Sequence, residues 1–80
     1  MRLDKYLKVS RIIKRRTIAR QACDADRVLV NEKVARASYA VKIGDKIEVQ
    51  MGSKPLKVEV VAINEHVRKE EACEMYTIIE

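Results

Sequence analysis

Residues 15–31 read RRTIARQACDADRVLVN, and the spacing of the apolar side chains in this stretch changes at Asp26. Before that point, isoleucine and alanine recur at the i, i+4 and i+7 spacing of a helix over about residues 18–25. Thr17 is the candidate N-cap, because its hydroxyl can accept a hydrogen bond from a free amide of the first turn. After Asp26, Arg27-Val28-Leu29-Val30 is a short run of the kind found in strands. A helix followed directly by a strand is therefore predicted.

A second helix is predicted nearer the N-terminus. Leu3, Tyr6 and Leu7 stand at i, i+3 and i+4, which places them on one face of a helix over about residues 2–9. The apolar pair at residues 12–13 is consistent with one further helical turn within a basic stretch.

Strand periodicity dominates the rest of the chain. Apolar and polar residues alternate over residues 47–51 and 56–60, the second of these strands is predicted to run on through Ile63, and residues 75–79 supply a last strand-like run. The charged segment 64–74 predicts a loop or a frayed turn. Because the helices carry the charge and the strands carry the core, an α+β fold is expected, with short N-terminal helices packed on a small, twisted antiparallel sheet.

Positive charge is concentrated at one end of the chain. The first 22 residues contain eight basic side chains and one acidic side chain, whereas the other 58 have a net charge of −2. A one-ended positive field indicates a polyanionic partner, and nucleic acid is the polyanion that a small Lys/Arg-rich protein meets most often.

Composition excludes a membrane protein. The longest apolar run, Val60–Ile63, is far too short to span a bilayer, and no apolar run of signal-peptide length follows the basic N-terminus. A single domain of 80 residues in the cytoplasm is expected.

Catalysis and cofactor binding are not supported by any motif. The acidic pairs have no partner histidine, activated serine or glycine-rich phosphate loop. Cys23 and Cys73 lie 50 residues apart and His66 has no ligand-spaced neighbour, so neither a metal site nor a disulfide is expected. The protein is predicted not to be an enzyme and to need no cofactor.

The arginines at the start of the second predicted helix form the main candidate site. Arg16 and Arg20 are four residues apart and can project from one face beside Thr17, where a helix start offers free amides. Like charges at this position oppose the helix dipole by a few tenths of a kcal/mol or more, which favours a use in phosphate binding. Arg2, at the start of the first helix, is expected to lie nearby, so that two helix starts, each with free amides as well as arginine, bind two nucleic-acid segments. Tyr39 is the candidate for stacking on a base.

Four motifs carry a resemblance to a known family. They are Met-Arg-Leu-Asp-Lys-Tyr-Leu at 1–7, Arg-Arg-Thr-Ile-Ala-Arg-Gln at 15–21, Arg-Val-Leu-Val-Asn at 27–31 and Val-Lys-Ile-Gly-Asp-Lys-Ile at 41–47. In this order and at this spacing they resemble the S4 RNA-binding domain. The resemblance covers about residues 1–50 and implies one S4-like domain over residues 1–80, closed by strands at about 55–80.

The resemblance implies an RNA-binding surface made of the short helices and the turn before the Gly-Asp element. The candidate RNA-contacting residues are Arg2, Lys5, Arg11, Arg15, Arg16, Thr17, Arg20, Lys33 and Lys42. One departure is plain, because many members have Asn-Gly-Lys where this chain has Asn31-Glu32-Lys33. The loss of the glycine argues against a turn with positive φ.

Among stand-alone members, the chain resembles most closely the short bacterial ribosome-binding proteins related to heat-shock protein fifteen, in particular the RqcP branch. This resemblance implies binding to large ribosomal subunits obstructed by peptidyl-tRNA, with contacts to large-subunit rRNA and to tRNA. In the RqcP branch it also implies support, with an RqcH-type elongation factor, for alanine tailing of stalled nascent chains.

Two other functions stay open at this point. A small DNA-binding regulator would use the helix after Thr17 as a recognition helix, but that helix is short, and only Gln21 on it is an amide reader of base edges. No dimerisation stripe is evident, so a monomer is expected. A structural ribosomal component present on every large subunit is the other alternative.

Overall fold

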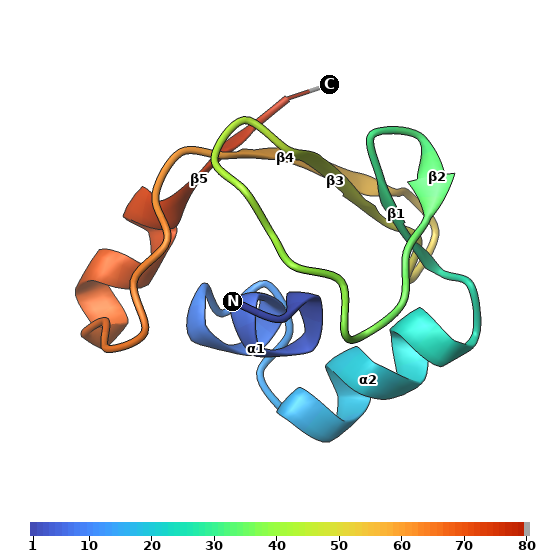
Figure 1. The fold of residues 1–80 in the computed structure, drawn as a ribbon, viewed down its shortest axis with the longest axis horizontal. Coiled ribbons are helices and arrows are strands. Elements are labelled where there is room, and N and C mark those ends of the chain that lie inside the picture. Colours follow the sequence, from blue (N-terminus) through green and yellow to red (C-terminus); the bar gives the residue numbers. More distant parts are fainter. Residues whose placement is uncertain (80) are drawn as a thin grey trace.

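The computed structural model describes residues 1–79, without the side chain of Cys73. Its elements are α1 (Leu3–Val9), α2 (Arg16–Asp24), β1 (Val28–Val30), β2 (Lys33–Val34), β3 (Lys46–Val49), β4 (Leu56–Val60), the 3-10 helix η1 (Lys69–Met75) and β5 (Tyr76–Ile78). Figure 1 shows α1 and α2 below one face of an arched sheet. The predicted α+β layout of short helices on an antiparallel sheet is confirmed.

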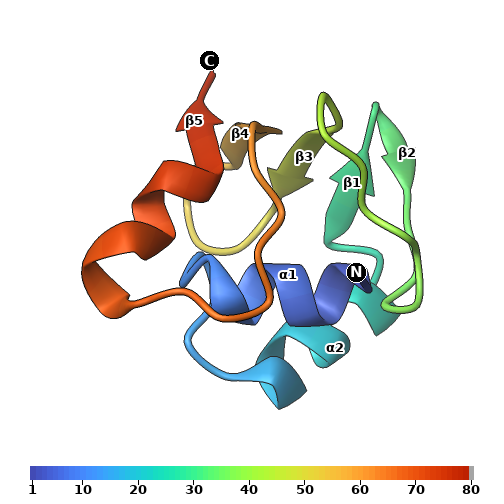
Figure 2. The same ribbon diagram turned by 60° about the vertical axis from the view of Figure 1, so that its left-hand side comes forward.

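The sheet has the strand order β2-β1-β3-β4-β5, and all neighbours pair antiparallel. A two-residue hairpin folds β2 back along the outer side of β1, so the inner side of β1 is left for β3. The chain reaches β3 through a long irregular connection over residues 35–45. This connection passes beside the N-terminus, as Figure 2 shows.

The core lies between α1 and the sheet. Leu3, Tyr6 and Leu7 are fully buried, as their shared helical face predicted, and they belong to one apolar cluster with valines of β1 and β4. Burying one such side chain contributes about 1.5 to 3 kcal/mol. The Tyr6 hydroxyl donates a hydrogen bond to the carbonyl of Met75 at 2.8 Å, which satisfies the one polar atom of the stripe. Burial raises the pKa of Tyr6, so the hydroxyl remains a donor.

The start of α1 is tied to the irregular connection. The amide of Leu3 donates to the carbonyl of Tyr39 at 2.8 Å, and the amide of Asp4 donates to that of Ala37 at 3.2 Å. These bonds occupy amides that a helix start otherwise leaves free. The prediction that α1 offers free amides to a ligand is therefore wrong at these two positions, because its first turn completes a small β-like pairing.

The start of α2 also differs from the prediction. The helix begins at Arg16, with Arg15 as N-cap in extended conformation, and Thr17 is already helical. The first helical hydrogen bond runs from the amide of Ala19 to the carbonyl of Arg15 at 3.0 Å, so the cap lies two residues earlier than predicted. In the described part of the chain, no side chain caps this end.

The segment between the helices is a series of turns and not a further helical turn. Ile13 is nevertheless buried and anchors this segment to the core. Arg11, just after the C-cap of α1, has a left-handed backbone with φ of 63°. Left-handed residues commonly end helices, but the position is usually glycine. The reversal at Arg11 ends α1, so the helix does not continue through Ile12 and Ile13.

The β1–β2 hairpin corrects a second expectation. Asn31 and Glu32 have φ values of 52° and 69°, so the turn has positive φ at both central positions although the glycine is missing. The Asn31 side chain supports this turn: its Oδ1 accepts from the amide of Lys46 and its Nδ2 donates to Asp45, both at 3.1 Å. Asparagine tolerates the left-handed region because its side chain forms such local bonds.

The C-terminal part contains more helix than predicted. Residues 64–68 are irregular, but η1 occupies Lys69–Met75, where a loop or frayed turn was expected. Ala72 and Met75 are buried, and these two apolar side chains explain why the charged segment folds back onto the domain.

Candidate nucleic-acid interface

A buried carboxylate lies at the centre of the basic N-terminal region. Asp4, the second residue of α1, is 3% exposed. The Nε atom of Arg2 lies 3.2 Å from its Oδ1, and the Nε atom of Arg16 lies 3.4 Å from its Oδ2. The amide of Lys5 also donates to Oδ1 at 2.8 Å. Asp4 thus joins the start of α1 to the start of α2 and positions two guanidinium groups.

The electrostatics of this cluster favour the charged carboxylate. Burial alone would raise the pKa of Asp4, but the hydrogen bonds from Arg16 and the Lys5 amide, with the charges of Arg16 and Arg2, outweigh burial and hold the pKa below its ordinary value. The side chains of Arg2 and Arg16 remain 51% and 48% exposed. Each arginine has five N–H donors, so both keep donors that face solvent and can reach a phosphate.

The start of α2 supplies backbone donors beside these arginines. Within residues 1–79, the amides of Arg16, Thr17 and Ile18 form no hydrogen bond, and no side chain caps the helix. Unpaired amides and the partial positive charge of a helix start favour an anion. Arg20 is exposed one turn further along α2. This end of α2 is chemically suited to hold a phosphate group.

Arg36 extends the cluster from the irregular connection. A hollow of about 380 Å³ is lined by Arg2, Arg20 and Arg36, together with acidic and small residues of α2 and the connection. We call Arg2, Arg16, Arg20 and Arg36 the arginine surface. Arg36 was missed from the sequence, because the stretch around it has no period and its proximity to Arg2 comes only from the pairing of residues 37–41 with the N-terminus.

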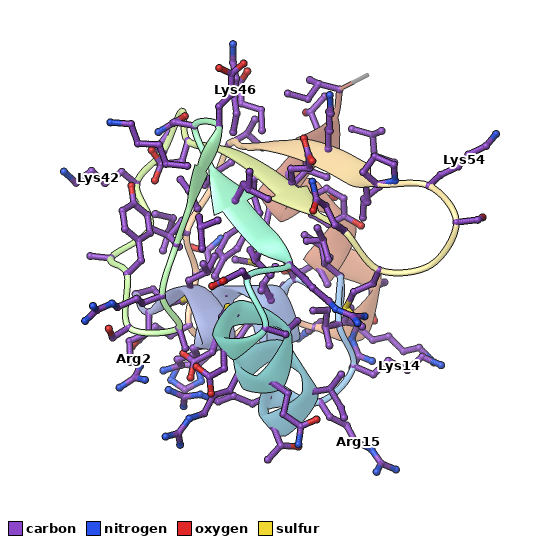
Figure 3. The ribbon with its side chains drawn as sticks, turned by 90° about the vertical axis from the view of Figure 1, so that its right-hand side faces the viewer. Arg2, Lys14, Arg15, Lys42, Lys46 and Lys54 are labelled. Carbon is purple, nitrogen blue, oxygen red and sulfur yellow. The ribbon has the colours of Figure 1, made fainter. Side chains whose placement is uncertain are left out.

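The other predicted site residues are spread over the molecule. The Nζ atom of Lys5 forms an ion pair with Oε1 of Glu65 at 3.1 Å. Arg11 lies just after the carboxyl end of α1, and Arg15 is the N-cap of α2. Lys33 lies on β2, outside the arginine surface. Figure 3 shows Lys42 at the end of the sheet away from α2, so the structure does not bring it together with Arg2 or Arg15.

Tyr39 has a structural contact that the sequence did not reveal. Its hydroxyl donates to Oδ2 of Asp45 at 2.9 Å, and the amide of Lys42 donates to the same oxygen at 2.9 Å. Burial would raise the pKa of Asp45, but these donors and Asn31 outweigh it and lower the pKa. The hydrogen bond to Asp45 also raises the pKa of Tyr39. Tyr39 therefore fastens the irregular connection to the turn before β3.

Reactive chemistry is not evident in the described residues. Cys23 is free and buried, and burial, with the charges of Asp4 and Asp24, raises its pKa to about 11, so the thiol is protonated at neutral pH. Residues 1–79 contain no group of three or more metal-ligating side chains. In the same range, no helix has the length and apolar character needed to cross a bilayer.

Comparison with known proteins identifies similar chains that are slightly longer than this one. A family model described as the S4 domain matches residues 1–47. A protein of Halalkalibacterium halodurans named RQC P-site tRNA stabilizing factor is 50% identical over 98% of this chain and 89% of its own length. A Bacillus subtilis protein of the same name is 49% identical over 99% of this chain and 92% of its own length. The structure of heat shock protein 15 from Vibrio cholerae, described as trimeric, superposes with a TM-score of 0.92 at 30% identity, over 99% of this chain and 81% of that chain.

Proposed function

The chain belongs to the S4 domain family, and on this premise we propose that it is an RNA-binding factor of ribosome-associated quality control that stabilises tRNA in the P site. Its similarity to proteins named RQC P-site tRNA stabilizing factor, at about half identity over nearly the whole chain, supports this function. Such a factor works in the cytoplasm, where ribosomes are.

The structural observation that carries the proposal is the pair of arginines held by Asp4 beside the uncapped start of α2. Two guanidinium groups fixed on one buried carboxylate bind phosphates with little further loss of side-chain entropy. The amides of α2 add donors for the same anion. Binding, not catalysis, is the output of this arrangement.

The finer partners follow from the same proposal. We propose that the protein recognises large ribosomal subunits obstructed by peptidyl-tRNA, and that it contacts both large-subunit rRNA and the tRNA. It would hold the tRNA in place while an RqcH-type elongation factor extends the stalled chain with alanine.

The decisive experiment is co-sedimentation of an Arg16→Ala variant with large subunits that carry peptidyl-tRNA. We expect loss of binding, because Arg16 contributes a guanidinium group at the centre of the arginine surface. The melting temperature should fall, because buried Asp4 would keep only Arg2 and the Lys5 amide as partners, so binding is measured at a temperature at which a thermal melt shows the variant to be folded. A Lys54→Ala variant is the matched control, because Lys54 is exposed on the far loop between β3 and β4.

Three results would contradict the proposal. A folded Arg16→Ala protein that binds normally would remove the arginine surface from the function. Tighter retention of the wild-type protein on duplex DNA than on structured RNA would favour a DNA-binding regulator. Equal sedimentation with all large subunits, with or without tRNA, would favour a structural ribosomal component.

A further inference from the structure

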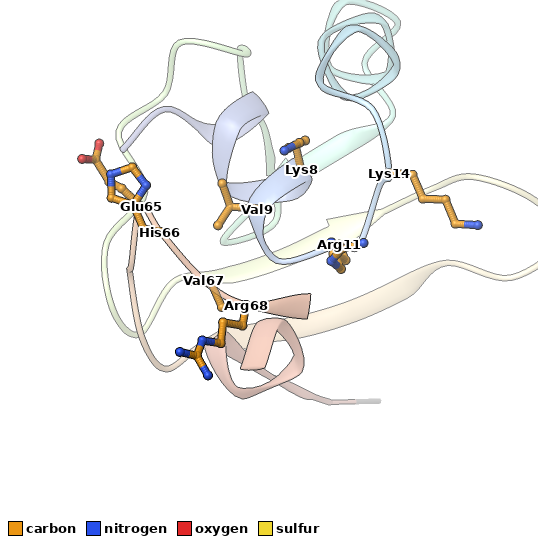
Figure 4. A pocket seen from close by; sticks show the side chains of 8 residues that line it. All are labelled: Lys8, Val9, Arg11, Lys14, Glu65, His66, Val67 and Arg68. Carbon is orange, nitrogen blue, oxygen red and sulfur yellow. The ribbon is translucent and has the colours of Figure 1, made fainter. Parts of the chain in front are cut away.

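A second basic surface lies at the opposite end of α1 from Asp4. It is an open groove of about 690 Å³ between two segments far apart in sequence. One side is formed by the end of α1 and the turns after it, and the other side by residues 65–68. Figure 4 shows both segments and the groove between them. We call it the basic groove; its charged and polar lining is Lys8, Arg11, Lys14, Glu65, His66 and Arg68.

The groove has an excess of positive charge that is not neutralised from within. Glu65 is its one acid, and this carboxylate is paired with Lys5, which lies outside the lining. Within the described part of the chain, none of Lys8, Arg11, Lys14 and Arg68 forms an ion pair. Four unpaired cations around one hollow attract an anion with several charges.

The helix dipole accounts for only part of this charge. Lys8 and Arg11 lie at the carboxyl end of α1, where cations stabilise a helix. Lys14 and Arg68 lie outside that helix, so their presence at the same groove has no such cause. Charge from a segment more than 50 residues away indicates a surface that is assembled for binding.

Arg11 provides an independent observation. Its left-handed backbone, with φ of 63°, costs an arginine about 1 to 2 kcal/mol, whereas glycine would adopt it freely. An arginine at this position therefore reduces stability and places an exposed guanidinium group on the groove. A backbone cost of this kind at an exposed cation is consistent with a functional contact.

The shape and lining identify the class of ligand. The groove is open, and its apolar part is limited to Val9 and Val67, which is too little for an apolar ligand or for the apolar face of a helix. An extended polyanion fits an open basic groove. His66 is exposed and adds a ring on which an unpaired base can stack.

We infer that the basic groove binds the phosphate backbone of a second RNA segment, distinct from the one held by the arginine surface. The inference rests on the proposed function and makes it more specific. α1 is seven residues long, about 10 Å, so the two surfaces are separated by roughly one short helix. The protein would bridge two RNA segments across α1.

The test compares three variants on the same purified large subunits that carry peptidyl-tRNA. Lys8→Ala combined with Arg68→Ala removes one cation from each side of the groove. Lys54→Ala combined with Lys57→Ala removes the same charge from the β3–β4 loop and the start of β4. Arg16→Ala reports on the arginine surface. Thermal melts establish that each variant is folded.

We expect the groove variant to bind more weakly in low salt. If both side chains contact phosphates, the slope of log affinity against log salt should become less negative by roughly 1.4 to 1.8. Hydroxyl-radical footprinting should show that the groove variant loses one protected RNA stretch and keeps the stretch that depends on Arg16. The control pair should match the wild type in slope and footprint.

A groove variant that matches the control pair would overturn the inference. Weaker binding with an unchanged footprint would also overturn it, because the groove would then contact a protein. In both cases the Arg16→Ala arm decides separately whether the proposed function stands.

Discussion

Asp4 is the residue on which the arrangement of the arginines depends. Its carboxylate is nearly inaccessible to water, yet it remains charged because two arginines and a backbone amide surround it. A buried charge whose partners are removed costs several kcal/mol, so Asp4, Arg2 and Arg16 form a mutually dependent group.

Replacing Asp4 with asparagine tests this dependence in two ways. Asp4→Asn should weaken RNA binding, because Arg2 and Arg16 lose their common anchor, and should lower the free energy of unfolding at neutral pH. The folded-state pKa of Asp4 lies below its ordinary value of 3.8, so the carboxylate stabilises the fold fully above that pH and less as the pH falls through the folded-state pKa. The difference in free energy of unfolding between wild type and variant should therefore be smaller at about pH 3 than at neutral pH. Urea unfolding at the two pH values measures it.

The control for that prediction is Asp24→Asn, because Asp24 is an exposed carboxylate on α2. For this variant, the free energy of unfolding should change between the two pH values by the same amount as it does for the wild type. If the difference in free energy of unfolding between wild type and Asp4→Asn is the same at both pH values, the pairing of Asp4 with the arginines does not stabilise the fold.

Individual site residues were only partly predictable. Arg16 and Arg20 follow from their spacing, which is a local property of a helix. Asp4 was not singled out, although a lone acid among eight bases was a signal that the segment contains an internal partner for arginine. Arg36 had no such signal, since its position depends on pairing between distant segments.

The turn after α1 combines a functional side chain with an unfavourable backbone. Arg11→Gly should raise the free energy of unfolding by up to about 1 kcal/mol, because glycine relieves the left-handed strain. The same change should weaken binding to large subunits that carry peptidyl-tRNA. Opposite changes in stability and affinity, from a thermal melt and co-sedimentation, would separate the two contributions of this residue.

Glu32→Gly is the matched control, since Glu32 has φ of 69° in the β1–β2 hairpin and lies outside the basic groove. It should also stabilise the fold, but it should not weaken binding. Equal effects of both glycines on affinity would mean that the charge of Arg11 is not used.

Helices and strands with a clear period were predicted well, and the turns between them were not. The stripe of α1 and the alternation in β3 and β4 reflect burial on one face, which a sequence displays directly. The hairpin was misjudged, because Asn31 gains its left-handed conformation from bonds to residues 14 and 15 positions away. η1 was missed because its sequence is mostly charged and contains only a few apolar residues, of which Ala72 and Met75 are buried.

Taken together, the two basic surfaces predict a strong dependence of affinity on salt. If about five phosphates are contacted, the slope of log affinity against log salt should be roughly −3.5 to −4.5. Filter binding of the wild-type protein to large subunits that carry peptidyl-tRNA, over a series of salt concentrations, measures it. A flat response would mean that the basic residues only solubilise the domain.

The family and the general fold were within reach of the sequence, because four motifs occur in a fixed order within the first 47 residues. The division of the positive charge into two surfaces was not. It depends on how residues 65–68 return to the end of α1, and this approach is held by the pair of Lys5 with Glu65 and by the packing of Val67 on the core.

The bond from Tyr6 to Met75 joins residues 69 positions apart, and this has a consequence for the order of events during translation. At about 5 to 20 residues per second, roughly 3 to 14 seconds pass between the synthesis of these two residues. During that interval the sheet that covers the apolar stripe of α1 is incomplete, because η1 and β5 have not yet been synthesised. The basic N-terminal helices are thus synthesised first, and the fold that positions their arginines is completed only when β4 and β5 have been added.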